Sequence, residues 1–183
     1  IHSKFDETID LNFEYIIGVG QMETEVKQFD KLITAYSNSQ LPDQNIHLVL
    51  LGEGIKMEEY IQLAKQNNIS DKVHFLGFQK NPYPYLKRAK FFVLSSMNEG
   101  MPNVILEALA CGIPVISFDC LSGPSEMITN KRNGLLVENQ NVEKLTEAMN
   151  LFIENSDLYT ICKENALPSC QHFSIVSIGQ QWL

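Results

Sequence analysis

Short apolar runs alternate with longer amphipathic segments along most of the chain. The apolar runs predict buried parallel strands, because a strand covered on both faces needs no polar side. The amphipathic segments carry apolar residues at helical spacing, as Val26, Phe29, Leu32, Ile33 and Tyr36 do. Strands that alternate with helices predict βαβ units, and therefore a parallel sheet with helices on both faces.

The expected elements follow one another in a regular order. We expect strands at residues 13–20, 46–51, 73–76, 91–94, 114–118 and 135–137. We expect helices at about 24–36, 56–67, 85–89, 102–112, 142–154, 158–166 and 174–182. Residues 1–12 are polar and unpatterned and are interpreted as an entry linker, whereas 13–183 form one Rossmann-like α/β domain. Such sheets bind ligands at the carboxyl ends of the strands, near the point where the strand order reverses.

The composition argues against several classes of function. The 183 residues carry a formal net charge of −8 without a basic run, which argues against a nucleic-acid partner. No apolar run approaches the length of a membrane span. The four cysteines lack CxxC spacing, so we expect reduced thiols in a cytoplasmic protein and no metal ligation. His47 and His74 fall within predicted strands, which favours structural roles. The chain begins at Ile1 without a signal peptide, which predicts an excised piece.

The segment 98–117 combines a loop, an apolar helix, a turn and a strand. Pro102 suits the first helical position, and Gly112 suits the left-handed position that ends a helix. Two carboxylates stand out. Glu99 lies just before the helix, and Glu107 lies inside it among apolar residues, where a carboxylate needs a partner or a ligand.

These carboxylates and the start of the helix form a candidate ligand site. Asn103 and Glu107 share one face of the helix, about 6 Å apart along its axis. The free N–H groups of Asn103 and Val104 favour an anion such as phosphate. This arrangement suits a ligand that combines sugar, phosphate and ribose. From spacing alone, a structural ion pair for Glu107 and a solvated loop acid for Glu99 explain the pattern equally well.

The context of the two glutamates resembles a known signature. Glu99 and Glu107 enclose seven residues, and Ala-Leu-Ala-Cys-Gly-Ile-Pro-Val-Ile follows. This segment resembles the E-x7-E signature of the retaining glycosyltransferases of family 4, which have the GT-B fold. The resemblance extends from about Phe13 to Trp182 and corresponds to the C-terminal, nucleotide-sugar-binding half of such enzymes. It implies that the N-terminal acceptor domain is absent from this chain.

The resemblance implies roles for the residues of this segment. Glu99 is expected to act in catalysis by accepting hydrogen bonds from hydroxyls of the donor sugar. Glu107 is expected to bind the ribose hydroxyls, which suits a carboxylate that faces a vicinal diol. Sugar and phosphate are expected to contact the backbone of Gly100, Met101, Pro102, Asn103 and Val104.

The loop after the first strand contains the main departure from the family pattern. Gly20 ends that strand, Gln21 follows it, and Lys27 comes six residues after Gln21. The resemblance implies that Lys27 and an arginine hold the donor diphosphate and stabilise its charge during catalysis. Gln21 stands where the family usually has this arginine, a loss of about 1.5–3 kcal/mol of phosphate stabilisation. Either the donor site is weak, or another cation such as Lys56 supplies the charge.

Three further loops are candidates for the site, and two of them have a second, structural interpretation. Gly52 and Gly54 match a family loop that lines the donor cleft, but a tight strand-to-helix turn explains them equally well. The segment Gly77–Asn81, with Phe78, is expected from the resemblance to pack around the base, largely through backbone groups. Ser122–Glu126 either borders the sugar or starts a helix with a serine as its cap.

Together these features predict the donor-binding half of a retaining glycosyltransferase. It would move a hexose or N-acetylhexosamine from a nucleoside diphosphate sugar, UDP rather than GDP, to an acceptor hydroxyl in glycan or surface polysaccharide synthesis. The resemblance implies neither metal nor cofactor, and a glycan or lipid-linked acceptor bound mainly by the N-terminal domain. It also implies peripheral association of the full-length protein with the cytoplasmic membrane face, and no turnover by this piece alone. Two alternatives stay open: a GT-B-type UDP-sugar epimerase, and a non-catalytic nucleotide-sugar-binding module, which Gln21 permits.

Overall fold

A computed structural model describes residues 9–170, so the helix expected at 174–182 and residues 1–8 of the expected linker lie outside the described residues. One sheet of six strands has the order β3-β2-β1-β4-β5-β6, and every pairing is parallel. The strands are β1 (Tyr15–Val19), β2 (His47–Leu51), β3 (Val73–Phe75), β4 (Phe92–Leu94), β5 (Val115–Asp119) and β6 (Gly134–Glu138). The predicted parallel α/β architecture is confirmed.

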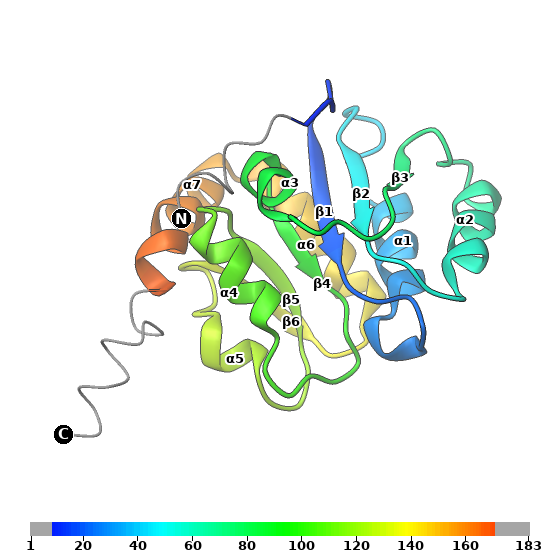
Figure 1. The fold of residues 1–183 in the computed structure, drawn as a ribbon. Coiled ribbons are helices and arrows are strands. Elements are labelled where there is room, and N and C mark those ends of the chain that lie inside the picture. Colours follow the sequence, from blue (N-terminus) through cyan, green and yellow to red (C-terminus); the bar gives the residue numbers. More distant parts are fainter. Residues whose placement is uncertain (1–8, 171–183) are drawn as a thin grey trace.

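Helices cover both faces of this sheet (Figure 1). One face packs against α1 (Phe29–Asn38), α2 (Met57–Gln66) and α6 (Val142–Glu154). The other face packs against α3 (Tyr83–Arg88), α4 (Asn103–Ala110) and α5 (Pro124–Met127). The last described helix, α7 (Ser156–Ser169), contacts both α4 and α6. Within residues 9–170, no helix is long and apolar enough to cross a membrane.

Alternation along the strands separates two core layers. Ile16 and Leu48 face the layer of α1, α2 and α6, whereas Ile17 and Val49 face the layer of α3, α4 and α5. Successive side chains of a strand point to opposite faces, and helices bury both faces here. This double burial explains why the strands are continuous apolar runs in the sequence.

The order of the strands reverses between β1 and β4. β1 pairs with β2 on one side and with β4 on the other, so the chain has crossed back over the sheet. The loops that follow β1 and β4 therefore start side by side and run in opposite directions from the carboxyl edge. This is the place at which doubly wound sheets bind ligands.

The segment expected to form one helix over 24–36 is broken. A 3-10 turn, Glu25–Lys27, precedes α1, and Gln28 between them has a φ of 45°. The Met97 N–H donates a hydrogen bond of 2.8 Å to the Val26 carbonyl. This contact with the loop after β4 holds the turn away from the axis of α1, a tertiary effect that helical periodicity does not reveal.

Other boundaries differ from expectation by a few residues. α3 begins at Tyr83 instead of 85, because Pro82 is its N-cap and another proline lies within its first turn. α7 begins at Ser156 instead of 158, because the Asn155 side chain caps it by accepting a hydrogen bond from Leu158 N–H. In both cases a proline or polar cap lets the helix begin two residues before the first residue expected from the apolar pattern.

His47 and His74 pack together beside the aromatic ring of Phe13. His47 Nδ1 lies 2.8 Å from His74 Nε2, and the Phe13 ring stacks on the two imidazoles at centroid distances of 4.2 and 4.5 Å. Burial lowers the pKa of both imidazoles, and the neighbouring His74 and Lys72 lower the pKa of His47 further, while Asp71 opposes the shift. This packing agrees with the structural roles expected for the two histidines.

We expect the free energy of unfolding to fall as the pH is lowered from about 7.5 to about 5.5. The folded pKa of each imidazole lies below its ordinary value of 6.5, so the unfolded chain binds more protons in this range. The stability is present above pH 6.5 and is lost as the pH falls toward the folded pKa values. Urea unfolding at both pH values measures the loss, which should shrink in the double variant His47→Gln, His74→Gln. An equal loss in both proteins would contradict the assignment.

Candidate nucleotide-sugar site

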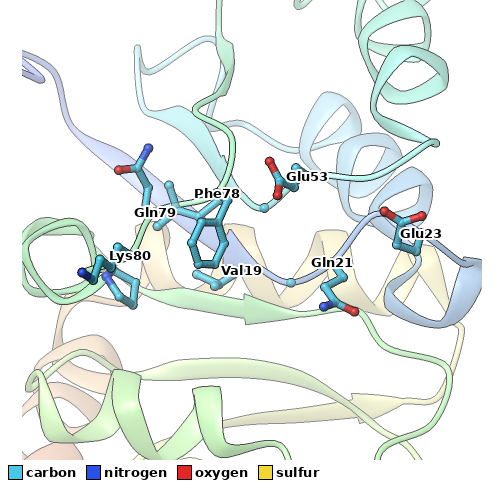
Figure 2. A pocket seen from close by; sticks show the side chains of 11 residues that line it. Val19, Gln21, Glu23, Glu53, Phe78, Gln79 and Lys80 are labelled. Carbon is cyan, nitrogen blue, oxygen red and sulfur yellow. The ribbon is translucent and has the colours of Figure 1, made fainter.

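A cleft of about 510 Å³ opens at the carboxyl ends of β1, β2 and β3 (Figure 2). This volume falls within the range of small-molecule sites, roughly 300–1,000 Å³. The lining residues come from three loops: Val19, Gly20, Gln21, Glu23, Leu51, Gly52, Glu53, Phe78, Gln79, Lys80 and Pro82. The cleft thus brings together four of the predicted site residues, namely Gly20, Gln21, Gly52 and Phe78.

Some of the other lining residues belong to loops that were expected at the site, although they were not singled out individually. Gln79 and Lys80 lie in the segment 77–81 that was expected to pack around the base, and Glu53 lies between the two glycines of the loop that was expected to line the donor cleft. Glu23 carried no signal in the sequence, because it follows the glycine-containing turn as an ordinary polar residue. Among the residues that line the cleft, Lys80 supplies the cation and the two glutamates supply the negative charge.

Phe78 stands in the middle of the cleft, between Lys80 on one side and Gln21 on the other (Figure 2). Its side chain is 67% exposed, which is unusual for a large aromatic residue. An exposed aromatic face in a concave site offers a stacking surface to a planar ligand. The cleft can therefore accept a nucleobase by stacking as well as through backbone groups.

Close backbone contacts hold the loops after β1, β2 and β3 together. The Gly20 N–H donates to the Leu51 carbonyl at 2.9 Å, and the Gly52 N–H donates to the Gly77 carbonyl at 2.8 Å. Gly52 has a φ of 139°, and a Cβ at this position would lie 1.8 Å from the Gly20 carbonyl oxygen. Gly54 has a φ of 151° and does not line the cleft. Both glycines are therefore required by the turn itself, and Gly52 lines the cleft in addition.

Replacing Gly52 with alanine is expected to lower the free energy of unfolding by about 2–4 kcal/mol. The new Cβ would clash with backbone atoms, which cannot move as a flexible side chain can. Gly100→Ala is the matched control, because its Cβ would meet nothing within 4 Å, and we expect a change within about 0.5 kcal/mol. Urea unfolding measures both, and equal losses would contradict the close approach of the loops.

An ion pair joins the loop after β1 to the loop after β4. Lys27 Nζ lies 2.6 Å from Glu99 Oε1, and the two side chains are 25% and 12% exposed. The aliphatic stem of Lys27 packs over Gly20, where a Cβ would lie 3.2 Å from it. The two predicted catalytic side chains are thus in direct contact at the point where the strand order reverses. Glu99 is therefore not the solvated loop acid that spacing alone had left open.

Serine side chains hold the backbone of this ion pair. Ser95 Oγ donates to the Lys27 carbonyl at 2.7 Å, and Ser122 Oγ donates to the Glu99 carbonyl at 2.9 Å. Ser122–Glu126 does contain a helix start, but Gly123 is the N-cap of α5 and no serine caps it. The serine cap was therefore a wrong prediction, because Ser122 bonds the neighbouring loop instead.

The start of α4 differs in two respects from expectation. Pro102 is the N-cap instead of the first helical residue, and no side chain caps the helix. The Asn103 N–H donates to the Met101 carbonyl at 2.9 Å, so the prediction of a free amide is wrong at Asn103. A tight turn at the proline accounts for this bond. The free amide of Val104 stays a prediction.

Glu107 lies half-buried on α4, one turn beyond Asn103. Burial raises the pKa of its carboxyl, and the charge of Glu107 in turn adds to the raised pKa of Tyr83. Among residues 9–170, no group forms a hydrogen bond or ion pair with the carboxylate. The ion-pair interpretation is therefore unsupported in this part of the chain, and the carboxylate is available to a ligand.

Lys56, the alternative cation to the missing arginine, forms ion pairs of its own. Lys56 Nζ lies 3.1 Å from Glu25 Oε1 and 3.3 Å from Glu59 Oε2, and Lys56 does not line the cleft. Two carboxylates engage this lysine away from the cleft lining and from the Lys27–Glu99 contact, which argues against that alternative. Gln21 itself does line the cleft, where it contributes an amide and no charge.

The predicted site residues thus form two groups. The cleft holds those expected near the base and the first phosphate. The remaining residues lie outside its lining, along the loop after β4, α4 and neighbouring loops: Lys27, Gly54, Glu99, Gly100, Met101, Pro102, Asn103, Val104 and Glu107. Across residues 9–170, no cluster of three His, Cys, Asp or Glu residues could hold a metal ion, and the four cysteines are free. A metal-independent reaction stays a prediction.

Solved structures with the GT-B fold share this arrangement of strands and helices. A mutant of S. aureus TarM in complex with Fondaparinux, alpha-GlcNAc-glycerol and UDP superposes with a TM-score of 0.84 at 23% identity, covering 97% of this chain and 36% of that chain. Anabaena HepE in complex with UDP gives a TM-score of 0.81 at 23% identity, covering 92% of this chain and 47% of that one. At such identity the likeness establishes the fold alone, that of the C-terminal domain of these enzymes.

The sequence comparisons identify the family. The family described as "Glycosyl transferases group 1" matches residues 2–167. A Campylobacter jejuni relative is 34% identical over 183 residues, which are 100% of this chain and 49% of the relative. It is named N-acetylgalactosamine-N,N'-diacetylbacillosaminyl-diphospho-undecaprenol 4-alpha-N-acetylgalactosaminyltransferase. The chain therefore belongs to the glycosyl transferases group 1 family, and it spans about half the length of this relative.

Proposed function

We propose that this chain binds the donor of a retaining glycosyltransferase of family 4, and that the donor is a UDP-sugar. The observation that carries the proposal is the Lys27–Glu99 contact at the reversal point of the sheet. In a member of a glycosyltransferase family, this contact joins the cation that we assign to the diphosphate and the carboxylate that we assign to the sugar hydroxyls. The adjoining cleft, with the exposed ring of Phe78, receives the base, and Glu107 receives the ribose hydroxyls.

Catalysis in this proposal is mainly electrostatic. The bond from the sugar to the diphosphate breaks through a transition state like an oxocarbenium ion, and negative charge grows on the departing diphosphate. Lys27 and the amide of Val104 stabilise that charge, without a metal ion. The name of the Campylobacter relative specifies an alpha-N-acetylgalactosaminyl transfer, and the TarM complex contains alpha-GlcNAc-glycerol. Transfer from an α-configured nucleotide sugar to an α-linked product requires retention, which supports the retaining reaction.

The acceptor and the remaining domain belong to the same proposal. The name of the Campylobacter relative contains N-acetylgalactosaminyl transfer and a diphospho-undecaprenol, a lipid carrier. By analogy, this chain works in transfer of an N-acetylhexosamine or hexose to a lipid-linked or surface glycan, at the cytoplasmic face of the membrane. An N-terminal domain outside this chain holds the acceptor, so this chain binds the donor but does not turn it over alone.

Calorimetric titration of the chain with UDP, GDP and ADP tests the proposal. We expect saturable binding of UDP, and binding of GDP and ADP that is weaker by about tenfold or more. If Gln21 has weakened the phosphate site below detection, Gln21→Arg should restore binding, because a bidentate charge-assisted contact is worth about 1.5–3 kcal/mol. Preference for another nucleotide would overturn the choice of UDP, and no binding by either protein would overturn the donor role.

One observation favours a second candidate function. Gln21 lines the cleft where the family usually has an arginine, and Glu23 and Glu53 add negative charge there. A site with weakened phosphate stabilisation suits a non-catalytic nucleotide-sugar-binding module. UDP-sugar binding without release of UDP by the full-length protein and its acceptor would favour this module over the transferase.

A further inference from the structure

Lys27 and Glu99 form a direct ion pair. The two side chains are mostly buried, and the contact of 2.6 Å is short for an ion pair. The charge of Glu99 also reaches the buried Cys120 thiol, whose pKa is raised first by burial and then by Glu99. Because the Glu99 side chain is only 12% exposed, water replaces a lost partner of its carboxylate less well than it would at the surface.

Lys27 and Glu99 bind each other through the same charged groups that the ligand would contact. A diphosphate that binds Lys27 must take this cation away from Glu99. Glu99 would then face a new anion with its side chain only 12% exposed, which is unfavourable for an unpaired carboxylate. A sugar attached to the diphosphate changes this outcome, because its hydroxyls donate hydrogen bonds to Glu99 and replace those of the ammonium group.

We infer that the Lys27–Glu99 pair makes the site select sugar nucleotides over free nucleoside diphosphates. This inference rests on the proposed donor role of the chain. When an intact sugar nucleotide separates the two side chains, its diphosphate pairs with Lys27 and its sugar hydroxyls bond to Glu99. A free nucleoside diphosphate pairs with Lys27 and leaves Glu99 without a partner. The pair is thus a specificity-determining contact, in addition to the role of each residue in transfer.

The same contact favours release of the product. Once the sugar has moved to the acceptor, its hydroxyls no longer hold Glu99, and the carboxylate competes with the diphosphate for Lys27. Closure of the pair displaces the nucleoside diphosphate and restores the Lys27–Glu99 contact. Ser95 and Ser122 keep the two backbones in register for this closure through their hydrogen bonds to the Lys27 and Glu99 carbonyls.

A double-mutant cycle on the 183-residue chain tests the inference. The variants are Glu99→Gln, Lys27→Met and their combination, each titrated with UDP, UDP-glucose and UDP-N-acetylglucosamine. Glu99→Gln should tighten UDP binding about tenfold, or 1.4 kcal/mol, because it frees Lys27 without changing the shape of the side chain. It should weaken binding of the preferred sugar nucleotide several-fold, so that the preference over UDP disappears.

The matched control removes a negative charge from the same site without touching the pair. Glu53→Gln, in the cleft lining, should tighten UDP binding by less than about threefold. In the Lys27→Met background, Glu99→Gln should increase the affinity for UDP by no more than Glu53→Gln does. Glu99→Gln could increase the affinity for UDP equally with and without Lys27, or leave it unchanged while UDP still binds. Either result would overturn the inference and leave the donor role intact. Failure of every variant to bind any of the three ligands would contradict the donor role, and the inference would fall with it.

Discussion

Glu107→Gln is expected to weaken UDP binding by about ten- to a hundredfold and to raise the stability of the chain at neutral pH. The carboxylate accepts two charge-assisted hydrogen bonds from the ribose in our account, each worth about 1.5–3 kcal/mol, and glutamine retains one neutral acceptor. The gain in stability follows from burial, because burial raises the pKa of Glu107 and no group among residues 9–170 forms a hydrogen bond or ion pair with its carboxylate.

The pH dependence of this gain has a definite sign. The folded pKa of Glu107 lies above its ordinary value of 4.5, so the folded protein binds more protons between those two values. Its contribution to the free energy of unfolding falls as the pH rises through that window, and the ionised carboxylate is unfavourable at pH 7. The stability advantage of glutamine should therefore be present at pH 7 and shrink below about pH 4.5.

Calorimetric titration with UDP and urea unfolding at both pH values measure the two effects. Glu164→Gln, on the exposed surface of α7, is the matched control and should change neither. Loss of binding together with a gain in stability is the signature of a residue kept for its ligand. A Glu107→Gln protein that binds UDP normally, or that is destabilised at pH 7, would make Glu107 a structural residue.

Lys27→Met is expected to lower the kcat of the full-length protein by about 100- to 1,000-fold, the usual effect of losing one preorganised group that stabilises transition-state charge. Methionine keeps the aliphatic stem that packs over Gly20, so the change removes the charge and little packing. The fold-decrease in kcat should exceed the fold-decrease in UDP affinity. In the UDP complex Glu99 still competes for Lys27, whereas sugar hydroxyls bind Glu99 when the donor is intact. Release of UDP in the presence of the acceptor measures kcat.

Lys56→Met provides the control for this second prediction. Lys56 is also an ion-paired lysine near the start of a helix, but its partners, Glu25 and Glu59, hold it outside the cleft. Its loss should change kcat by less than about twofold. Equal losses of activity in the Lys27→Met and Lys56→Met proteins would show that Lys27 contributes stability instead of transition-state charge stabilisation.

The spacing of apolar residues was sufficient to predict the sheet but not the turn that contains Lys27. The strands are uninterrupted apolar runs because both faces are covered, so their existence and parallel pairing could be predicted. The break at Gln28 could not, because the turn before it is held by a hydrogen bond from the Met97 N–H to the Val26 carbonyl, some seventy residues apart in the sequence. The helix propensity of neighbouring residues contains no information about a hydrogen-bond partner so distant in the sequence.

The candidate site shows the same division. The segment around Glu99 and Glu107 could be singled out because carboxylates beside an apolar helix are rare. The contact between Lys27 and Glu99 could not be predicted from spacing, since it depends on two loops that meet only after the sheet has formed. Likewise, Glu23 joins the cleft through the path of its backbone and not through any motif.

A crystal structure of the chain with UDP tests the central claim most directly. We expect uracil in the cleft against the ring of Phe78, and ribose hydroxyls within about 3.2 Å of the Glu107 carboxylate. We also expect the diphosphate beside Lys27 and the first turn of α4, at the point where the strand order reverses. UDP bound away from Glu107, with its phosphates on Lys80 or outside the carboxyl edge of the sheet, would contradict the account.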